Sequence, residues 1–353
     1  MAFAVGGLLV GLSAPASADQ EAHRGGRHGA VAVGGEIAGA ASDVEAYWTP
    51  ERMAAAVPVV ETLPEEPAGR AGLQEAAGVH PSGPQAVTEA AEAKSAAEAE
   101  AAEAAGVAAP LVRASADAAG PQDPVMRSVG QVMFHNPSDG KDHRCSAAAV
   151  NSPSKMMVLT AAHCIVVGGS GLLGEPTVMT NWVFIPAWNT GGVEAPYGKF
   201  PAKSYRGWNL WTKWTNHDYD YAFVTVRPNE KGEGLVETVG GNALGYNYGY
   251  EQSMRMVGYP LGYSSGHVQW RFVGTTRHST RNPNMLMMQQ SYFDHGASGG
   301  PWFRTYDPLT KTGMINGVTS LIHPGGTPTS GNNDSPRFDE LLKQLWDIQG
   351  PKV

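Results

Sequence analysis

The sequence predicts an all-β domain over residues 122–353, preceded by a region of different composition. After Pro121, short runs rich in Val, Ile, Tyr, Phe and Trp alternate with clusters of Gly, Pro, Asn and Ser, at intervals typical of a β-barrel or sandwich. Residues 19–121 are instead rich in Ala, Glu, Gly and Pro, and Tyr47 and Trp48 are their only aromatic residues. We therefore expect one folded domain of about 230 residues behind a low-complexity segment.

Seven runs in the domain have the composition of strands. They are rich in β-branched, aromatic or other apolar residues and are bounded by turn-forming residues. The runs are VGQVMF (129–134), MMVLTA (156–161), NWVFIPAW (181–188), YAFVTV (221–226), MRMVGYP (254–260), VQWRFVGTT (268–276) and INGVTSLI (315–322).

Only the end of the domain has a helical pattern. Ser335 is a candidate cap and Pro336 suits a first helical turn. The apolar residues that follow have helical spacing, so we expect them to pack against the domain. They are Phe338, Leu341, Leu342, Leu345 and Trp346.

Residues 1–18 have the features of a signal peptide. The apolar run AFAVGGLLVGLSAPASA ends in Ala16, Ser17 and Ala18, a small-x-small pattern typical of signal peptidase sites. The stretch 2–12 is about half as long as a membrane span. No Lys or Arg precedes it, so translation starts further upstream or the charged part of the signal is atypical. We expect a secreted, extracellular product with no membrane association after signal removal.

Residues 19–121 have two interpretations, a disordered linker and a removable pro-segment. The stretch TEAAEAKSAAEAEAAEAAG (88–106) has strong helix formers but no Leu or Ile stripe, so an isolated or fluctuating helix is expected. Residues 19–120 carry 16 acidic and 6 basic residues, whereas the chain from Pro121 onward carries 17 and 19. An acidic pro-segment is therefore expected to dock on the less acidic domain. Without a basic stripe, the domain has no feature of nucleic-acid binding.

The two cysteines lie 19 positions apart inside the domain. In an exported chain, an even number of cysteines favours a disulfide, here between Cys145 and Cys164. The rival interpretation is a zinc site that adds His143 and His163. Adjacent His163 and Cys164 are poorly placed to reach one tetrahedral ion together, so no metal site is predicted.

The stretch DHGASGGPWF (294–303) surrounds Ser298 with glycines. It fits the G-x-S-x-G elbow of esterases and lipases, and also the G-x-S-G-G-P loop of trypsin-like proteases. An elbow needs a helix directly after the serine, and Gly299, Gly300 and Pro301 start helices poorly. The order of the catalytic residues in the chain also favours the trypsin-like loop. In elbow enzymes the serine comes first and the acid and histidine follow it, whereas here the only histidine after Ser298 is His323.

Better partners for Ser298 stand before it. His163 lies near the end of VLTAAHC (158–164), where a strand-like stretch runs into two alanines that allow a tight turn. Asp220 stands directly before the apolar run 221–226, where a buried carboxylate can hold the tautomer of an imidazole. We prefer Asp220 to Asp218, which is interpreted as a loop or capping residue.

These motifs, VLTAAHC, DYAFV and GASGGP, together resemble the catalytic segments of chymotrypsin-like (trypsin-like) serine endopeptidases over residues 125–348. The stretch CSAAAVNSPSKMMVLTAAHC is similar to secreted bacterial members near the glutamyl endopeptidase group. The resemblance implies two packed six-stranded antiparallel β-barrels with the site between them. It also implies a triad of His163, Asp220 and Ser298 and an oxyanion hole from the N–H groups of Gly296 and Ser298. Polypeptides would be the substrates of a monomer that needs no cofactor.

The sequence departs from that family in its activation and specificity positions. Ala297 takes the place of the acid that pairs with a newly cut N-terminus in trypsin-like zymogens, so activation by that ion pair is not expected. Tyr292 replaces the aspartate of enzymes that cut after Lys or Arg, and Thr319 replaces the histidine of glutamyl endopeptidases. The expected pocket residues are Tyr292, Phe293, Asp294, His295, Thr319, Ser320 and Leu321, and Tyr292 and Phe293 are equally candidates for the core.

Three functions follow from these features. A secreted endopeptidase accounts for all three motifs, whereas an esterase or lipase rests only on the G-x-S-x-G match. A catalytically silent β-barrel binding protein is the third. Cleavage of a protein such as casein discriminates the first from the second, because serine proteases also cleave esters.

Overall fold

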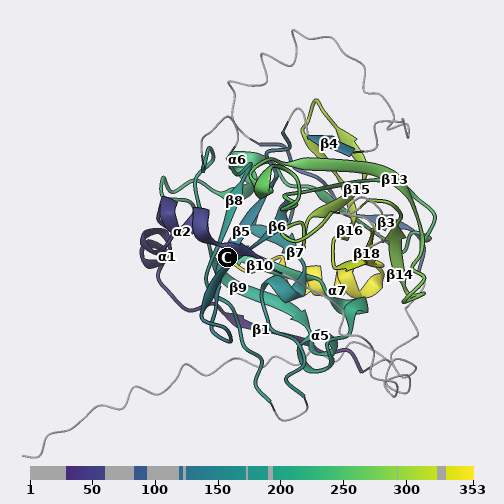
Figure 1. Ribbon diagram of the computed structural model, residues 1–353, viewed down its shortest axis with the longest axis horizontal. Coiled ribbons are helices and arrows are strands. Elements are labelled where there is room, and N and C mark those ends of the chain that lie inside the picture. Colours follow the sequence, from purple (N-terminus) through teal and green to yellow (C-terminus); the bar gives the residue numbers. More distant parts are fainter. Residues whose placement is uncertain are drawn as a thin grey trace, which may run out of the picture.

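The structure is a computed structural model that describes residues 29–59, 83–93, 119–121, 125–171, 174–189, 194–291, 293–323 and 331–353. Two β-sheets make up most of the domain, and short helices lie around them (Figure 1). The expected signal peptide, most of the expected helix at 88–106 and Tyr292 lie outside the described residues, and 88–93 are not helical.

The first sheet closes into the predicted six-stranded antiparallel barrel. Its neighbours run in the order β9-β10-β7-β6-β5-β8, and β8 pairs back onto β9 to complete the ring. Buried apolar side chains such as Val132, Leu159, Phe184 and Phe223 fill it. The strands are β5 (Val129–Asn136), β6 (Lys141–Val150), β7 (Met157–Thr160), β8 (Thr180–Pro186), β9 (Phe200–Trp208) and β10 (Ala222–Val226).

The second sheet runs in the order β17-β18-β14-β13-β12-β15-β16-β11. Within the described residues, the strands at the two ends of this sheet do not pair with each other. The second of the two predicted barrels is therefore a sheet that does not close into a ring. Met256, Leu286 and Trp302 lie in one of its apolar clusters. Its strands are β11 (Ala243–Tyr246), β12 (Ser253–Gly258), β13 (Trp270–His278), β14 (Met285–Met288), β15 (Pro301–Asp307), β16 (Thr312–Val318), β17 (Leu321–His323) and β18 (Asn332–Pro336).

One predicted strand is two strands in the structure. The run INGVTSLI belongs to β16 and β17, which are separated at Thr319 and Ser320. The Thr319 N–H donates to the carbonyl oxygen of Gly300, and the Ser320 N–H donates to that of Asp334. The backbone therefore changes partner between these residues, which places both beside the loop of Ser298.

The C-terminal helix α7 (Glu340–Gln349) begins later than predicted. Asp339 caps it by accepting a hydrogen bond from the Leu341 N–H, whereas Ser335 and Pro336 belong to β18. The Ser335 hydroxyl is already used, because it accepts from the Val318 N–H. The apolar stripe packs as expected, with Leu341, Leu342 and Leu345 buried.

The remaining helices are short. They include α5 (Asn209–Trp214), α6 (Leu235–Val239) and three 3-10 turns, at Ala162–Cys164, His217–Tyr219 and Ser264–Gly266. In the described part of the chain, no helix combines the length and hydrophobicity that a membrane crossing requires.

Parts of the N-terminal region add strands to both sheets. Trp48 in this region is fully buried, which its composition did not predict. Strand β1 pairs with β9, β2 with β6, β3 with β11 and β4 with β13. The elements are β1 (Ala32–Glu36), α1 (Ala41–Tyr47), α2 (Pro50–Ala55), β2 (Val57–Pro58), β3 (Ala86–Val87) and β4 (Ala119–Pro121).

Candidate active site

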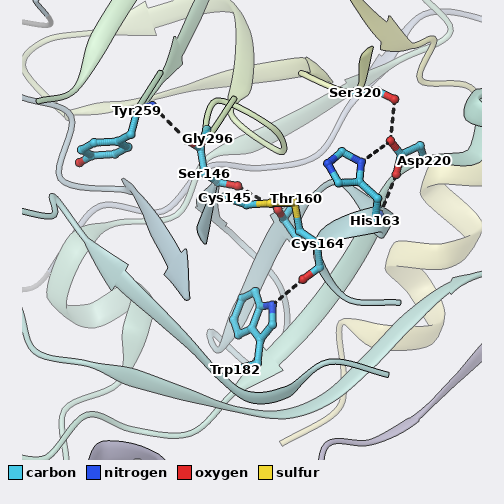
Figure 2. Close-up of a disulfide and its surroundings, with 10 residues drawn as sticks. All are labelled: Cys145, Ser146, Thr160, His163, Cys164, Trp182, Asp220, Tyr259, Gly296 and Ser320. Atoms are coloured by element: carbon cyan, nitrogen blue, oxygen red, sulfur yellow. Dashed lines mark hydrogen bonds and ion pairs between the residues drawn. A yellow bond between two sulfur atoms is a disulfide. The ribbon is translucent and has the colours of Figure 1, made fainter. Parts of the chain in front are cut away.

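His163 is positioned by a short turn that a disulfide fixes. Strand β7 ends at Thr160, and a 3-10 turn over Ala162–Cys164 follows at once. Cys164 is bonded to Cys145 of β6, as predicted, so the sulfurs are joined to each other instead of forming the rival zinc site (Figure 2). The small side chains of Ala161 and Ala162 are buried, and His163 is 4% exposed. The turn therefore holds the imidazole in one place on the barrel.

Asp220 lies beside this imidazole, between the 3-10 turn over His217–Tyr219 and strand β10. One carboxylate oxygen is 2.7 Å from His163 Nδ1, and the other accepts a hydrogen bond of 2.9 Å from the His163 backbone N–H (Figure 2). Asp218 is directed elsewhere, since its carboxylate accepts from the side-chain amides of Asn282 and Asn284. Of the two candidate acids, the structure brings Asp220 to His163.

The hydroxyl of Ser320 is a further partner of Asp220, at 2.6 Å. Burial by itself raises the pKa of Asp220, but His163, His217 and this hydroxyl outweigh burial and hold the pKa below its usual range. Each favours the charged carboxylate through its positive potential or its hydrogen bond. Asp220 is therefore an anion that favours the tautomer of His163 with the proton on Nδ1. In this tautomer Nε2 can accept a proton.

Aromatic rings flank the histidine. The ring of Trp211 in α5 lies 6.1 Å from that of His163 and 5.4 Å from that of His217, between ring centroids. Burial lowers the pKa of His217, although Asp220 opposes this shift. The imidazole of His217 and the indole of Trp211 therefore form this side of the site.

The loop that carries Ser298 packs against the first barrel. The Ser146 N–H donates to the carbonyl oxygen of Ser298 at 2.7 Å. Gly299 has a φ of +77°, and a Cβ there would meet Thr160 Oγ1 at 2.1 Å. Only glycine permits this approach between the loop and the end of β7. The Ser298 hydroxyl is buried and makes no hydrogen bond within the described residues.

The backbone beside Ser298 presents two N–H groups that the described fold leaves unused. Ala297 and Gly299 donate their N–H groups to Asp294 and Thr319, whereas those of Gly296 and Ser298 donate to no described group. Gly296 has a φ of +93°, which a side chain would strain. Its carbonyl oxygen accepts from Ser146 Oγ at 2.8 Å, and that hydroxyl accepts from the Tyr259 N–H (Figure 2). The two N–H groups expected to form the oxyanion hole therefore make no hydrogen bond to a described group.

Ala297 occupies an apolar setting. It is fully buried in a cluster that includes Phe293, Met256 and Trp302. A charged N-terminus inserted here would find no carboxylate on residue 297.

The expected pocket residues have varied surroundings. Phe293 is fully buried in the same apolar cluster as Ala297. The Asp294 carboxylate accepts from the Gly262 N–H, and burial raises its pKa despite this hydrogen bond. His295 is partly exposed and Leu321 is buried. The Thr319 hydroxyl accepts from the Trp302 indole, so Thr319 and Ser320 use their hydroxyls within the fold.

Sequence reasoning missed two residues of the site. Ser146 was not singled out, and Ser320 was expected in the substrate pocket instead of against Asp220. Ser146 and Gly296 are 150 positions apart in the sequence, so no local spacing predicts their contact. The place of Ser146 directly after Cys145 was the one available signal.

Residues 122–335 match the profile of the trypsin family. The chain belongs to the trypsin family. Its members are serine proteases, so the chain is a hydrolase of peptide bonds with the chymotrypsin-like fold described above. Among curated protein sequences, none matches the chain significantly.

Two solved structures of proteases are similar to this trypsin-family chain. The protease Anisep from Arthrobacter nicotinovorans has 27% identity and a TM-score of 0.56, covering 66% of this chain and 99% of its own. A thermostable serine protease from an extremophilic microorganism has 23% identity and a TM-score of 0.56, covering 65% and 99%. A solved Glu endopeptidase has 15% identity over 69% of this chain and 100% of its own, with a TM-score of 0.47, so it supports no argument on glutamate preference.

Proposed function

We propose that the chain is a secreted serine endopeptidase that cleaves polypeptides through an acyl-enzyme intermediate. The observation that supports this most directly is the 2.7 Å contact between His163 Nδ1 and the buried Asp220 carboxylate. The Ser298 loop is bound to Ser146, and Ser146 directly follows Cys145, whose disulfide partner Cys164 directly follows His163. This arrangement supplies a nucleophile, a base and an orienting acid.

In the proposed first step, the Ser298 hydroxyl oxygen attacks the carbonyl carbon of the scissile peptide bond. His163 Nε2 takes the hydroxyl proton and then gives it to the nitrogen of the leaving amine, so the C–N bond breaks and an ester to Ser298 remains. Water attacks this ester by the same route, which releases the acid and restores the serine. Asp220 stabilises the imidazolium in each half of the cycle.

The N–H groups of Gly296 and Ser298 would hold the oxygen that becomes negative during each attack. Removal of one such donor costs about 3 to 4 kcal/mol of transition-state stabilisation in comparable sites. Ser146 fixes the peptide plane after Gly296, so the geometry exists before the substrate arrives.

Secretion and a removable N-terminal segment are part of the proposal. The signal-like residues 1–18 and a disulfide suited to an oxidising compartment support export. With Ala297 beside the nucleophile, activation would follow removal of the segment without a new ion pair at this position.

The esterase alternative lacks support from the local fold. The elbow pattern requires a helix after the serine. Here the chain enters strand β15 at Pro301.

A peptide library digested by the secreted protein tests the proposal. Mass spectrometry of the products gives the cleavage sites, and mass spectrometry of the enzyme gives its own N-terminus. We expect internal peptide bonds to be cut without a strong preference for Lys or Arg, by a chain that begins after Asp19. Ester hydrolysis without peptide cleavage would contradict the function, and a secreted chain that begins at Asp19 would contradict the pro-segment.

A further inference from the structure

A two-helix segment of the N-terminal region covers an apolar surface on the outside of the first barrel. On β8, Trp182 and Phe184 belong to the barrel core, so the alternate residues Val183 and Ile185 point outward. Helices α1 and α2 lie beside this strand (Figure 1). The cluster joins Val44, Trp48, Met53 and Ala56 of the segment to Met133, Val183, Ile185, Trp188 and Tyr259 of the domain. Burial of this surface holds the segment in place.

Polar contacts fix the orientation of the segment. The Trp48 indole donates to the carbonyl oxygen of Asn181 at 2.5 Å, and Lys199 Nζ donates to the carbonyl oxygen of Trp48 at 3.0 Å. Arg52 forms an ion pair with Asp142 of the domain at 2.9 Å. In this ion pair the segment supplies the cation and the domain supplies the anion.

The segment continues from α2 into the edge of β6. Strand β2 pairs in parallel with this edge, with Pro58 opposite Arg144. The Val59 N–H then donates to the carbonyl oxygen of Arg144 at 3.1 Å. Strand β5 takes the other edge of β6 over these residues, so β2 uses the backbone groups that a further peptide would need there.

This edge lies next to the candidate oxyanion site. Arg144 is two residues before Ser146, which holds the carbonyl oxygen of Gly296. Pro58 Cβ is 3.5 Å from the position that a Cβ on Gly296 would take. A substrate whose carbonyl oxygen reaches the N–H groups of Gly296 and Ser298 must run past Gly296. Pro58 lies in that space.

We propose that residues 41–59 are a tethered inhibitor of this protease. The cluster around Trp48 docks the segment, Pro58 stands in the approach to Gly296, and Val59 occupies the edge of β6. This inference rests on the proposed function and deepens it. Removal of the segment frees both the edge of β6 and the approach to Gly296, which is an activation mechanism that needs no acid at position 297.

The test measures peptide hydrolysis by the exported chain before and after loss of its N-terminal region, with intact mass recorded for each sample. We expect the unprocessed chain to be slow and Trp48→Ala to accelerate it roughly 10- to 100-fold at unchanged mass, because the tryptophan anchors the docked segment. Val59→Pro removes the hydrogen bond to Arg144 and should also raise the rate of peptide hydrolysis by the unprocessed chain. Val87→Ala is the control, since Val87 is 48% exposed in β3 of the same region; its rate should equal that of the parent.

A second measurement remains valid if these variants fold poorly. A synthetic peptide of residues 41–59 should inhibit the processed enzyme, whereas a peptide of residues 41–56 should inhibit it several-fold less, because it lacks β2. If the unprocessed parent chain hydrolyses peptide as fast as the processed chain, the proposed inhibition is wrong but the protease function stands. The same conclusion follows if the two peptides inhibit equally or if neither inhibits. A processed chain that hydrolyses no peptide would overturn the proposed function and this inference with it.

Discussion

Ser146 Oγ donates to the carbonyl oxygen of Gly296 at 2.8 Å, and this bond joins the first barrel to the loop of Ser298. The neighbouring N–H of Ser146 also binds the Ser298 carbonyl oxygen. A single residue of β6 thus holds the loop on both sides of Ala297. The first barrel therefore holds the loop that carries the proposed oxyanion donors, although this loop belongs to the second half of the domain.

Ser146→Ala should lower kcat with little change in KM. The variant leaves the Gly296 peptide without its side-chain partner, and misplacement of a donor costs roughly 10- to 100-fold in rate. Steady-state kinetics on a peptide substrate measure the effect. Ser138→Ala is the control, because Ser138 is exposed in the turn before β6. Equal kcat values for Ser146→Ala and the parent would contradict this role.

Asp220→Asn should nearly abolish turnover, whereas Asp218→Asn should not. An amide at position 220 holds the wrong tautomer of His163, and the corresponding change in such triads lowers kcat about 10⁴-fold. Asp218 binds Asn282 and Asn284 instead, so its loss should affect stability more than kcat. The two variants are compared by kcat, with circular dichroism to show that both fold. A larger loss of kcat in Asp218→Asn would refute the assignment.

The contribution of Asp220 to stability should depend on pH. Its pKa in the folded chain is lowered, because the opposing effects of His163, His217 and Ser320 outweigh burial. A lowered pKa stabilises the fold above the unfolded value of about 4, and this stabilisation is lost as the pH falls through the folded pKa. Urea unfolding of the parent and Asp220→Asn should show a difference in the free energy of unfolding at pH 7 that narrows below about pH 4. If the difference in the free energy of unfolding grew as the pH fell, the pKa of Asp220 would be raised by folding, which contradicts this prediction.

Loss of the disulfide should reduce both stability and activity. Cys145 and Cys164 close a loop of 19 residues, for which the expected stabilisation is about 3 kcal/mol. The bond also fixes the turn of His163, so kcat should fall as well. Thermal unfolding and kinetics of a Cys145→Ala, Cys164→Ala double variant measure the two effects. An unchanged melting temperature would show that packing alone holds the turn.

The sequence predicted much of the domain because its signals are local. The strand-like runs and the disulfide depend on neighbouring residues, and the structure contains the disulfide and a strand in each run, although INGVTSLI is divided between two strands. The start of α7 was predicted too early because Ser335 and Pro336 have capping chemistry but pair in β18 instead. Strand pairing at this site outweighs the local preference.

The roles of Ser146, Ser320 and Trp48 were not predictable in the same way. Each contacts a residue far away in the chain, and its own neighbourhood carries no pattern for that contact. Trp48 is an isolated aromatic residue in a region of low complexity, where composition indicates little core. The cluster that buries it includes the outward-facing residues Met133 of β5 and Val183 and Ile185 of β8.

The most direct test of the account is the labelling of the processed protein by a fluorophosphonate probe, followed by peptide mapping. The probe requires an activated serine, so it reports on His163, Asp220 and the oxyanion donors together. We expect one adduct on Ser298 that is absent from Ser298→Ala and strongly reduced in Asp220→Asn. A folded, processed protein that takes no label, or that takes it on another serine, would contradict the central claim.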